Sequence, residues 1–394
     1  MDPMKDRVFS FFILLPFIWL STGMLILKNG DKTMVAMIII SIIVTIYRYG
    51  LTSIKQNLSN KMLWLVSLIT VYSLFSYTYH GLSSTEIRAI ISSLLLIAIF
   101  PRQIITRKTL IPLAFLGVII STTMIWYWCQ YLGISRGYWP INAIPFSTLT
   151  ASFTLVCLIM AITDTKKSIK ALMLISFIVG CGGLVLGETR GVWLGFICSL
   201  ILFTIFWMKD NYQPRYWFYI LSVILIMGVT LFVLKPKLEQ RIIQTKHEYA
   251  AIESGNLCTS IGLRLQLWKA STILIENHPI IGLGDQHSRE FDELYKEGRI
   301  SQCLYNLQPA HYHNQYIDKL VKNGVIGLVL FLSLLLTPLW LCSKEHYTKY
   351  ITISLCTLLA IASLTDVPFN HGPTLFIYMT YICILNYKSS QKSI

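Results

Sequence analysis

Long apolar segments, separated by short polar connections, run through almost the whole chain. A helix needs about 20 mostly apolar residues to cross the roughly 30 Å hydrocarbon core of a bilayer. The chain is 54% hydrophobic and only 13% charged, whereas an average soluble domain has about 25% charged residues. We therefore predict an all-α polytopic membrane protein with about twelve transmembrane helices. The predicted spans are residues 9–27, 33–47, 62–79, 86–100, 109–131, 145–163, 169–187, 191–208, 216–235, 323–342, 348–365 and 371–387.

The formal net charge of +14 is a topology signal, because Lys and Arg are enriched in the short cytoplasmic loops of membrane proteins. With the N-terminus in the cytoplasm, short segments on that side hold seventeen Lys and Arg residues, and those on the other side hold five. Both termini are therefore predicted to be cytoplasmic. The same distribution accounts for the charge without a nucleic-acid partner, which would require basic residues clustered on one soluble face.

One long polar segment, residues 236–322, follows the ninth predicted span. The charge pattern places it on the side opposite the termini. The predicted organisation is helices 1 to 9 in residues 1–235, a large outer loop with amphipathic helices in 236–322, and helices 10 to 12 in 323–394.

Of the nine cysteines, only Cys258 and Cys303 lie in this loop. An oxidising compartment permits a disulfide between them, but the bond also requires a geometry that sequence does not supply. A disulfide and two free thiols are both open alternatives.

The connection between the seventh and eighth spans contains Gly187, Glu188, Thr189, Arg190 and Gly191. An arginine at the edge of the bilayer is costly unless it is paired, reaches the interface or lines an aqueous cavity, so Arg190 is a candidate functional residue. The alternative is a plain turn in which Arg190 reaches lipid phosphates. The flanking glycines favour close approach of another helix or a ligand to the backbone.

A second arginine, Arg264, lies on an amphipathic helix predicted in the outer loop and expected to lie against the membrane or the bundle. Arg264, Trp268 and Ser271 share a stripe beside the apolar face. Two fixed guanidiniums suit a pyrophosphate, because each offers planar bidentate donors and stays charged. A solvated Arg264 is the alternative. The apolar positions of this helix are Leu263, Leu267, Ala270 and Leu274.

His311 and His313 directly precede the tenth span. If the helix begins near here, His313 shares a stripe with Ile317 and Leu320 and points toward the bundle, whereas His311 points elsewhere. A histidine can accept a proton from a sugar hydroxyl near neutral pH, as a general base must. The alternative is a helix-start histidine bonded to the backbone.

No metal site is predicted, because His311 and His313 would diverge on a helix and no third ligand is evident. The sequence also has no Asp-x-Asp pair for metal-assisted sugar transfer, no phosphate-binding loop and no Ser-centred nucleophile elbow. Asp31 and Asp366 are lone carboxylates that could assist.

Several short motifs follow one another between residues 189 and 328. They are Thr189-Arg190-Gly191 before a span, Arg264 followed by Trp268 and Ala270, Asn277-His278-Pro279-Ile280-Ile281-Gly282-Leu283-Gly284, and His313-Asn314 leading into Leu320, Gly324, Gly327 and Leu328. Together these motifs resemble those of the O-antigen ligases. Their order and spacing, the twelve predicted spans and the loop between the ninth and tenth spans are similar to that family.

The resemblance implies a GT-C glycosyltransferase of the Gram-negative inner membrane, without metal or cofactor, whose active site and large loop face the periplasm. Such enzymes transfer O-antigen from undecaprenyl pyrophosphate to a sugar hydroxyl of lipid A-core, which completes lipopolysaccharide. By motif match, Arg190 and Arg264 bind the donor pyrophosphate and His313 activates the acceptor. Attack opposite the leaving group would invert the anomeric centre. Secondary candidates are His311, Asn314, Glu188, Trp268 and Asp366.

Two other functions are compatible with the sequence. An O-antigen polymerase or a protein O-oligosaccharyltransferase would share the fold and the loop motifs and differ in acceptor, although the polymerases more often have two prominent outer loops. A lipid-linked glycan transporter would also have many spans, but transporters commonly carry a two-fold repeat that this sequence lacks.

Overall fold

The computed structural model describes residues 3–211, 228, 235, 239–240, 242–342 and 345–385. The regular elements of this part are helices, and no strand occurs among them. The prediction of an all-α chain is confirmed for these residues.

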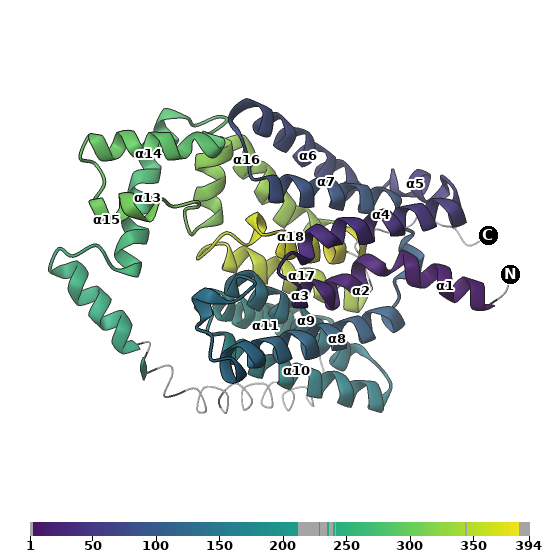
Figure 1. The fold of residues 1–394 in the computed structure, drawn as a ribbon. Coiled ribbons are helices and arrows are strands. Elements are labelled where there is room, and N and C mark those ends of the chain that lie inside the picture. The colour runs from purple at the N-terminus through teal and green to yellow at the C-terminus, as the bar shows by residue number, and fades with distance from the viewer. Residues whose placement is uncertain are drawn as a thin grey trace.

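Most of the described helices pack side by side in one bundle (Figure 1). α9 lies deepest in it, packed against α8, α10 and α17, and it is buried along nearly its whole length. The bundle consists of α1 (Pro3–Ile13), α2 (Leu15–Ser21), α3 (Gly23–Ile26), α4 (Gly30–Tyr49), α5 (Thr52–Asn57), α6 (Lys61–His80), α7 (Ser84–Ile99), α8 (Arg107–Trp126), α9 (Ala143–Thr163), α10 (Lys167–Gly187), α11 (Arg190–Asp210), α16 (Gln315–Trp340), α17 (His346–Ala362) and α18 (Gly372–Tyr378), with the π-helical turn η6 (Met379–Ile384) after it.

Most buried hydroxyl groups of α9 donate to carbonyls of the same helix, whereas Ser147 Oγ has no partner among the described residues. Thr150 Oγ1 donates to the Phe146 carbonyl at 3.1 Å, and Thr154 Oγ1 donates to the Thr150 carbonyl at 2.7 Å. Because a hydroxyl in an apolar interior is costly without a partner, this backbone bonding lets polar residues occupy the centre of the bundle.

Among the described residues, seven helices are long and apolar enough to cross a membrane, and a bent pair, Met4–Ile13 with Leu15–Ile26, brings the number to eight if it is one span. The chain is therefore a multi-pass membrane protein. Three further predicted spans coincide with helices that are shorter, namely α7, α17 and α18 with η6. The predicted span 216–235 lies outside the described residues except for 228 and 235. Twelve spans and the GT-C fold remain predictions.

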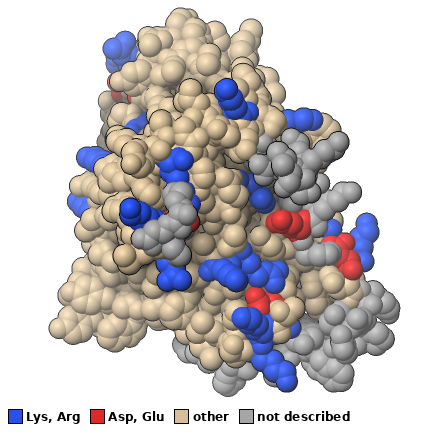
Figure 2. Space-filling model, turned by 90° about the vertical axis from the view of Figure 1, so that its right-hand side faces the viewer, with Lys and Arg blue, Asp and Glu red and all other residues tan. Residues whose placement is uncertain are grey.

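Charged residues sort to two ends of the bundle. Arg48 pairs with Asp6 at 3.0 Å, and both belong to segments predicted on the cytoplasmic side. Arg88 pairs with Asp31 at 2.6 Å, and both belong to segments predicted on the outer side. Every ion pair found among the described residues joins two residues of one predicted side. Lys and Arg side chains are frequent on the face toward the α1 end, where acidic side chains are few (Figure 2).

The helices of the outer loop lie together at the end of the molecule away from α1 and α5 (Figure 1). They are α13 (Ser260–Asn277), α14 (His287–Lys296) and α15 (Gln302–Leu307). They enclose an apolar core of their own, which α16 completes through Val321. The predicted apolar face of α13 is confirmed, because Leu267, Ala270 and Leu274 are buried in this core.

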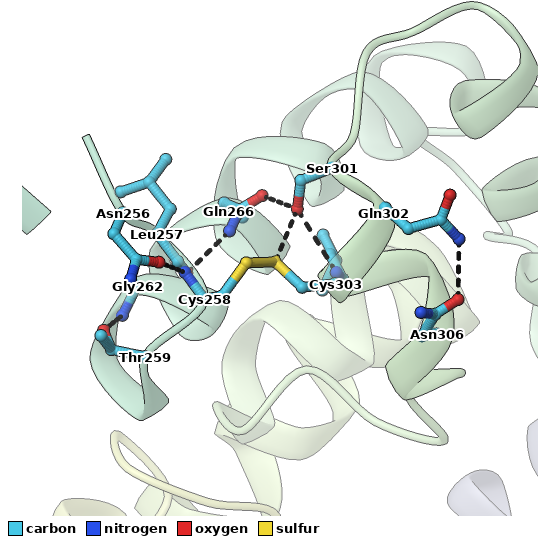
Figure 3. The surroundings of a disulfide bond; sticks show 11 residues. Asn256, Leu257, Cys258, Thr259, Gly262, Gln266, Ser301, Gln302, Cys303 and Asn306 are labelled. Atoms are coloured by element: carbon cyan, nitrogen blue, oxygen red, sulfur yellow. Dashed lines mark hydrogen bonds between the residues drawn. A yellow bond between two sulfur atoms is a disulfide. The ribbon is translucent and has the colours of Figure 1, made fainter.

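A disulfide joins Cys258 and Cys303, whose Cα atoms are 5.8 Å apart (Figure 3). It ties the residues just before α13 to α15. Gln266 supports the same junction, because its Nε2 donates to the Leu257 carbonyl at 2.9 Å and its Oε1 accepts a hydrogen bond from Ser301 (Figure 3). Of the two alternatives left open by the sequence, the structure has the disulfide.

The sequence between α13 and α14 packs into a break in α16. At the break Gly324 has φ +62°, and a Cβ atom there would lie 2.1 Å from the Ile280 carbonyl oxygen. Val325 N donates to the Pro279 carbonyl at 2.8 Å, so the break gives the incoming segment a backbone partner. This contact explains why glycine is needed at position 324.

Candidate functional site

A cavity of about 400 Å³ lies where α11, α13 and the end of α17 meet. Three arginines from different parts of the chain line it: Arg190 begins α11, Arg264 lies on α13, and Arg136 lies in the 3₁₀ turn η3 (Arg136–Tyr138). Glu248 and Asp366 also line it. We call it the arginine cavity. Three guanidiniums against two carboxylates leave a positive lining, which suits an anionic ligand.

Arg190 is held at the cavity by a tight junction between α11 and the end of α17. Glu188 has φ +50° after the end of α10, and Arg190 is the first residue of α11. A Cβ atom at Gly191 would lie 1.9 Å from Thr365 Oγ1, so α11 can approach this close only with glycine there. Arg190 Nη1 donates to Thr245 Oγ1 at 3.3 Å. Its guanidinium therefore adds to the partial positive charge at the start of a 21-residue helix.

Arg264 and Trp268 project from α13 toward the residues around His313. Arg264 Nη1 donates to the Thr365 carbonyl at 3.4 Å, and Trp268 Nε1 donates to the Tyr312 carbonyl at 2.9 Å. The shared stripe predicted for these two side chains is in keeping with both contacts. Trp268 fixes the backbone immediately before His313, while Arg264 reaches the residue before Asp366.

His313 precedes α16 rather than lying on it. The helix begins at Gln315, and the Asn314 side chain caps it by accepting hydrogen bonds from Tyr316 N and Ile317 N at 3.0 and 3.2 Å. His313 has φ +48°, a left-handed conformation. The predicted stripe that placed His313 on the helix is therefore wrong, because the asparagine cap starts the helix after the histidine.

Asp366 is the partner of His313. Its Oδ1 lies 3.5 Å from His313 Nδ1, and the carboxylate side chain is only 4% exposed. Burial acts to raise the pKa of Asp366, but contact with His313 and attraction to the protonated forms that His311 and His371 adopt in acid outweigh it and lower the pKa below its ordinary value. Asp366 is thus an ionised carboxylate beside the imidazole.

His311 stacks edge-on against His313, with ring centroids 4.4 Å apart. Burial, assisted by repulsion from His313, lowers the pKa of His311 to about 4. His311 is therefore neutral at physiological pH, and it contributes packing and hydrogen bonding rather than charge.

His311, His313 and Asp366 could together hold a metal ion, because one ligand atom from each lies within 4.8 Å of the others. The reasons given against a metal site on sequence grounds are wrong in two respects. The histidines do not diverge on a helix, because α16 begins at Gln315, and Asp366 supplies a third ligand from a distant part of the chain. Three N and O donors of this kind suit zinc or a related transition metal.

The structure also brings in residues that the motifs did not indicate. Arg136 lines the arginine cavity, and its Nη1 donates to the Glu188 carbonyl at 2.9 Å. Glu248 Oε2 accepts a hydrogen bond from Ile261 N at 2.9 Å in the first turn of α13. The one sequence signal for Arg136 was its position as a lone arginine in a predicted outer connection. Glu188 contributes its carbonyl to this arrangement and does not itself line the cavity.

Part of the chain is similar to a known protein family. Residues 175–332 match the family model described as "O-Antigen ligase". The matched segment contains Arg190, Arg264 and His313, whereas Arg136 and Asp366 lie outside it. The matched residues are less than half of the chain, and over them the chain is similar to the O-antigen ligase family.

A relative described as "Uncharacterized protein" occurs in Haemophilus influenzae (strain ATCC 51907 / DSM 11121 / KW20 / Rd). It is 27% identical to the chain over 182 residues, which are 45% of this chain and 44% of that protein. The chain thus spans less than half the length of this relative.

Proposed function

We propose that the chain is an O-antigen ligase that transfers a glycan from undecaprenyl pyrophosphate to a sugar hydroxyl of lipid A-core. Members of the matched family are glycosyltransferase-like membrane enzymes that act as ligases or polymerases. The observation that carries the proposal is the meeting of Arg136, Arg190 and Arg264 in one cavity beside the His313–Asp366 pair.

The arginines bind the donor pyrophosphate. A pyrophosphate that leaves without a metal needs fixed positive charge where its negative charge develops, and guanidiniums supply planar, permanently charged donors. Arg190 begins a helix and Arg264 lies within one, so both are carried by regular elements rather than by a free loop. We expect removal of one such donor to lower the transfer rate by about 10²- to 10³-fold.

His313 is the general base. The contact of Nδ1 with the ionised Asp366 favours the tautomer in which Nδ1 carries the hydrogen, which leaves Nε2 free to accept a proton. The acceptor hydroxyl gives its proton to Nε2 as its oxygen bonds to the anomeric carbon. The bond from that carbon to the pyrophosphate breaks, and undecaprenyl pyrophosphate leaves with the electron pair. Displacement from the opposite face inverts the anomeric centre.

The enzyme resides in the bacterial inner membrane, with both termini in the cytoplasm, residues 236–322 as the periplasmic loop, and twelve spans in a GT-C fold. Support comes from the sorting of ion pairs into two ends and from the position of α13, α14 and α15 away from the α1 end (Figure 1). The arginine cavity is then periplasmic, where a donor already carried across the membrane would meet lipid A-core.

A reconstituted transfer assay tests the proposal. Purified protein, lipid-linked O-antigen and lipid A-core should yield ligated product with inverted configuration by NMR. His313→Ala should lower the rate by about 10²- to 10⁴-fold, and Arg190→Lys or Arg264→Lys should weaken donor use because an ammonium does not reproduce bidentate geometry. As a control, Tyr138→Ala, an exposed change in η3, should have no effect.

Three outcomes contradict this assignment. Extension of the donor glycan in place of ligation would make the protein a polymerase, and ligation to a protein would make it an oligosaccharyltransferase. Translocation without new glycosidic bonds would make it a transporter.

A further outcome concerns the base. If EDTA abolishes transfer and added zinc restores it, His311, His313 and Asp366 bind a metal ion, and the assignment of His313 as a metal-free general base is wrong.

A further inference from the structure

A second cavity, of about 850 Å³, opens beside His311. It is bounded by the end of α6, the connection to α7, the turn before α14 and the segment before α18. Its lining shares no residue with the arginine cavity. The polar side chains that matter here are those of Tyr77, Ser84, Asp285, His311, Lys322 and His371.

The general base lies between the two cavities. His311 lines the second cavity and stacks on His313, with ring centroids 4.4 Å apart. His313 in turn lies 3.5 Å from Asp366, which lines the arginine cavity. A group bound in the second cavity therefore meets the histidine pair from the His311 side, and a pyrophosphate in the arginine cavity meets it from the Asp366 side.

The walls of the second cavity are fixed by close backbone contacts. Asp285 N donates to the Gly81 carbonyl at 3.3 Å, and a Cβ atom at Gly284 would lie 2.3 Å from that same carbonyl oxygen. Lys322 Nζ donates to the Ala310 carbonyl at 2.7 Å and pairs with Asp318 at 3.3 Å. The residues on either side of the opening are thus held by hydrogen bonds and by glycine packing.

We propose that the second cavity binds the acceptor sugar of a lipid-anchored saccharide, and this inference rests on the function proposed above. An inverting displacement requires the attacking hydroxyl to approach the anomeric carbon from the face opposite the leaving pyrophosphate, with the base beside that hydroxyl. The second cavity opens toward the histidine pair from a side that the arginine cavity does not occupy. The lining offers what a sugar needs, namely hydroxyl, carboxylate, imidazole and ammonium groups that donate and accept hydrogen bonds. His371 lines the cavity, and its buried Nε2 has no hydrogen-bond partner among the described residues.

The cavity is also placed for an acceptor that stays in the membrane. Tyr77 lies on α6, and the same helix exposes Val71, Phe75 and Tyr79 with 65%, 44% and 63% of their surface accessible. An exposed apolar and aromatic helix face is suited to lipid and to the membrane interface. The lipid part of the acceptor would lie along α6 while its sugar enters the cavity.

Two variants test the inference in the reconstituted assay. Ser84→Trp fills the opening, and Asp285→Asn removes its carboxylate with little change of shape; both side chains are exposed. Each should raise the KM for lipid A-core at least fivefold while the KM for the lipid-linked donor stays within twofold. Binding of lipid A-core to the donor-free protein in nanodiscs should weaken by a similar factor. Ser254→Trp and Glu293→Gln, exposed changes in the outer loop that line neither cavity, are the matched controls.

The readouts separate failure of this inference from failure of the proposed function. If the wild type transfers glycan but both cavity variants keep wild-type acceptor KM and binding, the acceptor binds elsewhere and the inference is wrong. If the variants raise the donor KM instead, the cavity belongs to the donor. If the wild type transfers nothing, the proposed function is wrong, and the binding measurement with lipid A-core still decides whether this cavity holds that saccharide.

Discussion

The backbone conformation of His313 decides what its side chain can do. A helical His313 would have pointed into the bundle, whereas the left-handed residue before the Asn314 cap reaches Asp366 and His311. A positive φ is uncommon for a histidine, and such residues persist where surrounding contacts hold them. Here Trp268 holds the Tyr312 carbonyl on one side, and Asn314 caps α16 on the other.

A buried histidine in the outer loop makes stability depend on pH. His287 is 5% exposed, and its Nδ1 lies 3.2 Å from the Tyr312 hydroxyl oxygen. Burial, followed by repulsion from Lys322, lowers the pKa of His287 from 6.5 to about 4. The pKa of His287 is lower in the folded protein than in the unfolded chain. Its contribution to the free energy of unfolding is therefore fully present above about pH 6.5 and is lost as the pH falls toward 4. Between pH 7 and pH 5 the loss is about 2 kcal/mol.

His287→Gln should remove this part of the pH dependence. The variant keeps a hydrogen-bonding group for Tyr312 and does not titrate, so its melting temperature should fall less than that of the wild type between pH 7 and pH 5. His278→Gln, at an exposed histidine of the same segment, should behave like the wild type. If the melting temperature falls equally in the wild type and in His287→Gln between pH 7 and pH 5, His287 is not buried in its neutral form.

At the scale of elements, the site depends on how closely α11 approaches α17. Gly191→Ala should push the two helices apart, because the new methyl group would overlap Thr365 Oγ1. Arg190 and Thr365, whose carbonyl accepts from Arg264, would both shift. We expect transfer activity to fall at least tenfold, since misplacement of about 1 Å can cost about 10²-fold in rate.

Gly182→Ala on α10 is the control for that change. A Cβ atom at Gly182 meets nothing within 4 Å among the described atoms, so alanine there should leave activity unchanged and slightly favour the helix. Comparable activity of Gly191→Ala and Gly182→Ala in the transfer assay would show that the tight α11–α17 contact does not set the arginine geometry.

Apolar periodicity predicted the helices and their approximate ends, and helical spacing predicted the buried face of α13. It could not predict contacts between distant segments. Asp366 and His313 meet only because α17 returns to the start of α16, and Arg136 reaches the arginine cavity through a bond to the Glu188 carbonyl. The break at Gly324 was equally hidden, because it depends on the Ile280 carbonyl packing against it.

At the scale of the whole molecule, charge separates two ends. The end that carries α13, α14 and α15 also holds the three main candidate residues, Arg190, Arg264 and His313. Nearly the whole outer loop lies between Arg190 and His313 in the sequence. The face toward the α1 end shows many Lys and Arg side chains and fewer acidic ones (Figure 2). In a membrane, the positive end stays on the cytoplasmic side because short loops rich in Lys and Arg resist translocation.

Labelling of introduced cysteines tests this orientation. With the seven cysteines outside the disulfide replaced by serine or alanine, Ser254→Cys should react with a membrane-impermeant maleimide in cells whose outer membrane is permeable. Lys167→Cys, at the start of α10, should react only after the inner membrane is broken. Both positions are exposed, so a difference in labelling reports the side of the membrane rather than burial. The reverse labelling pattern would place the arginine cavity on the cytoplasmic side. The lipid A-core that receives the glycan in the periplasm could not reach the cavity there. The ligase proposal would then be wrong together with the predicted topology.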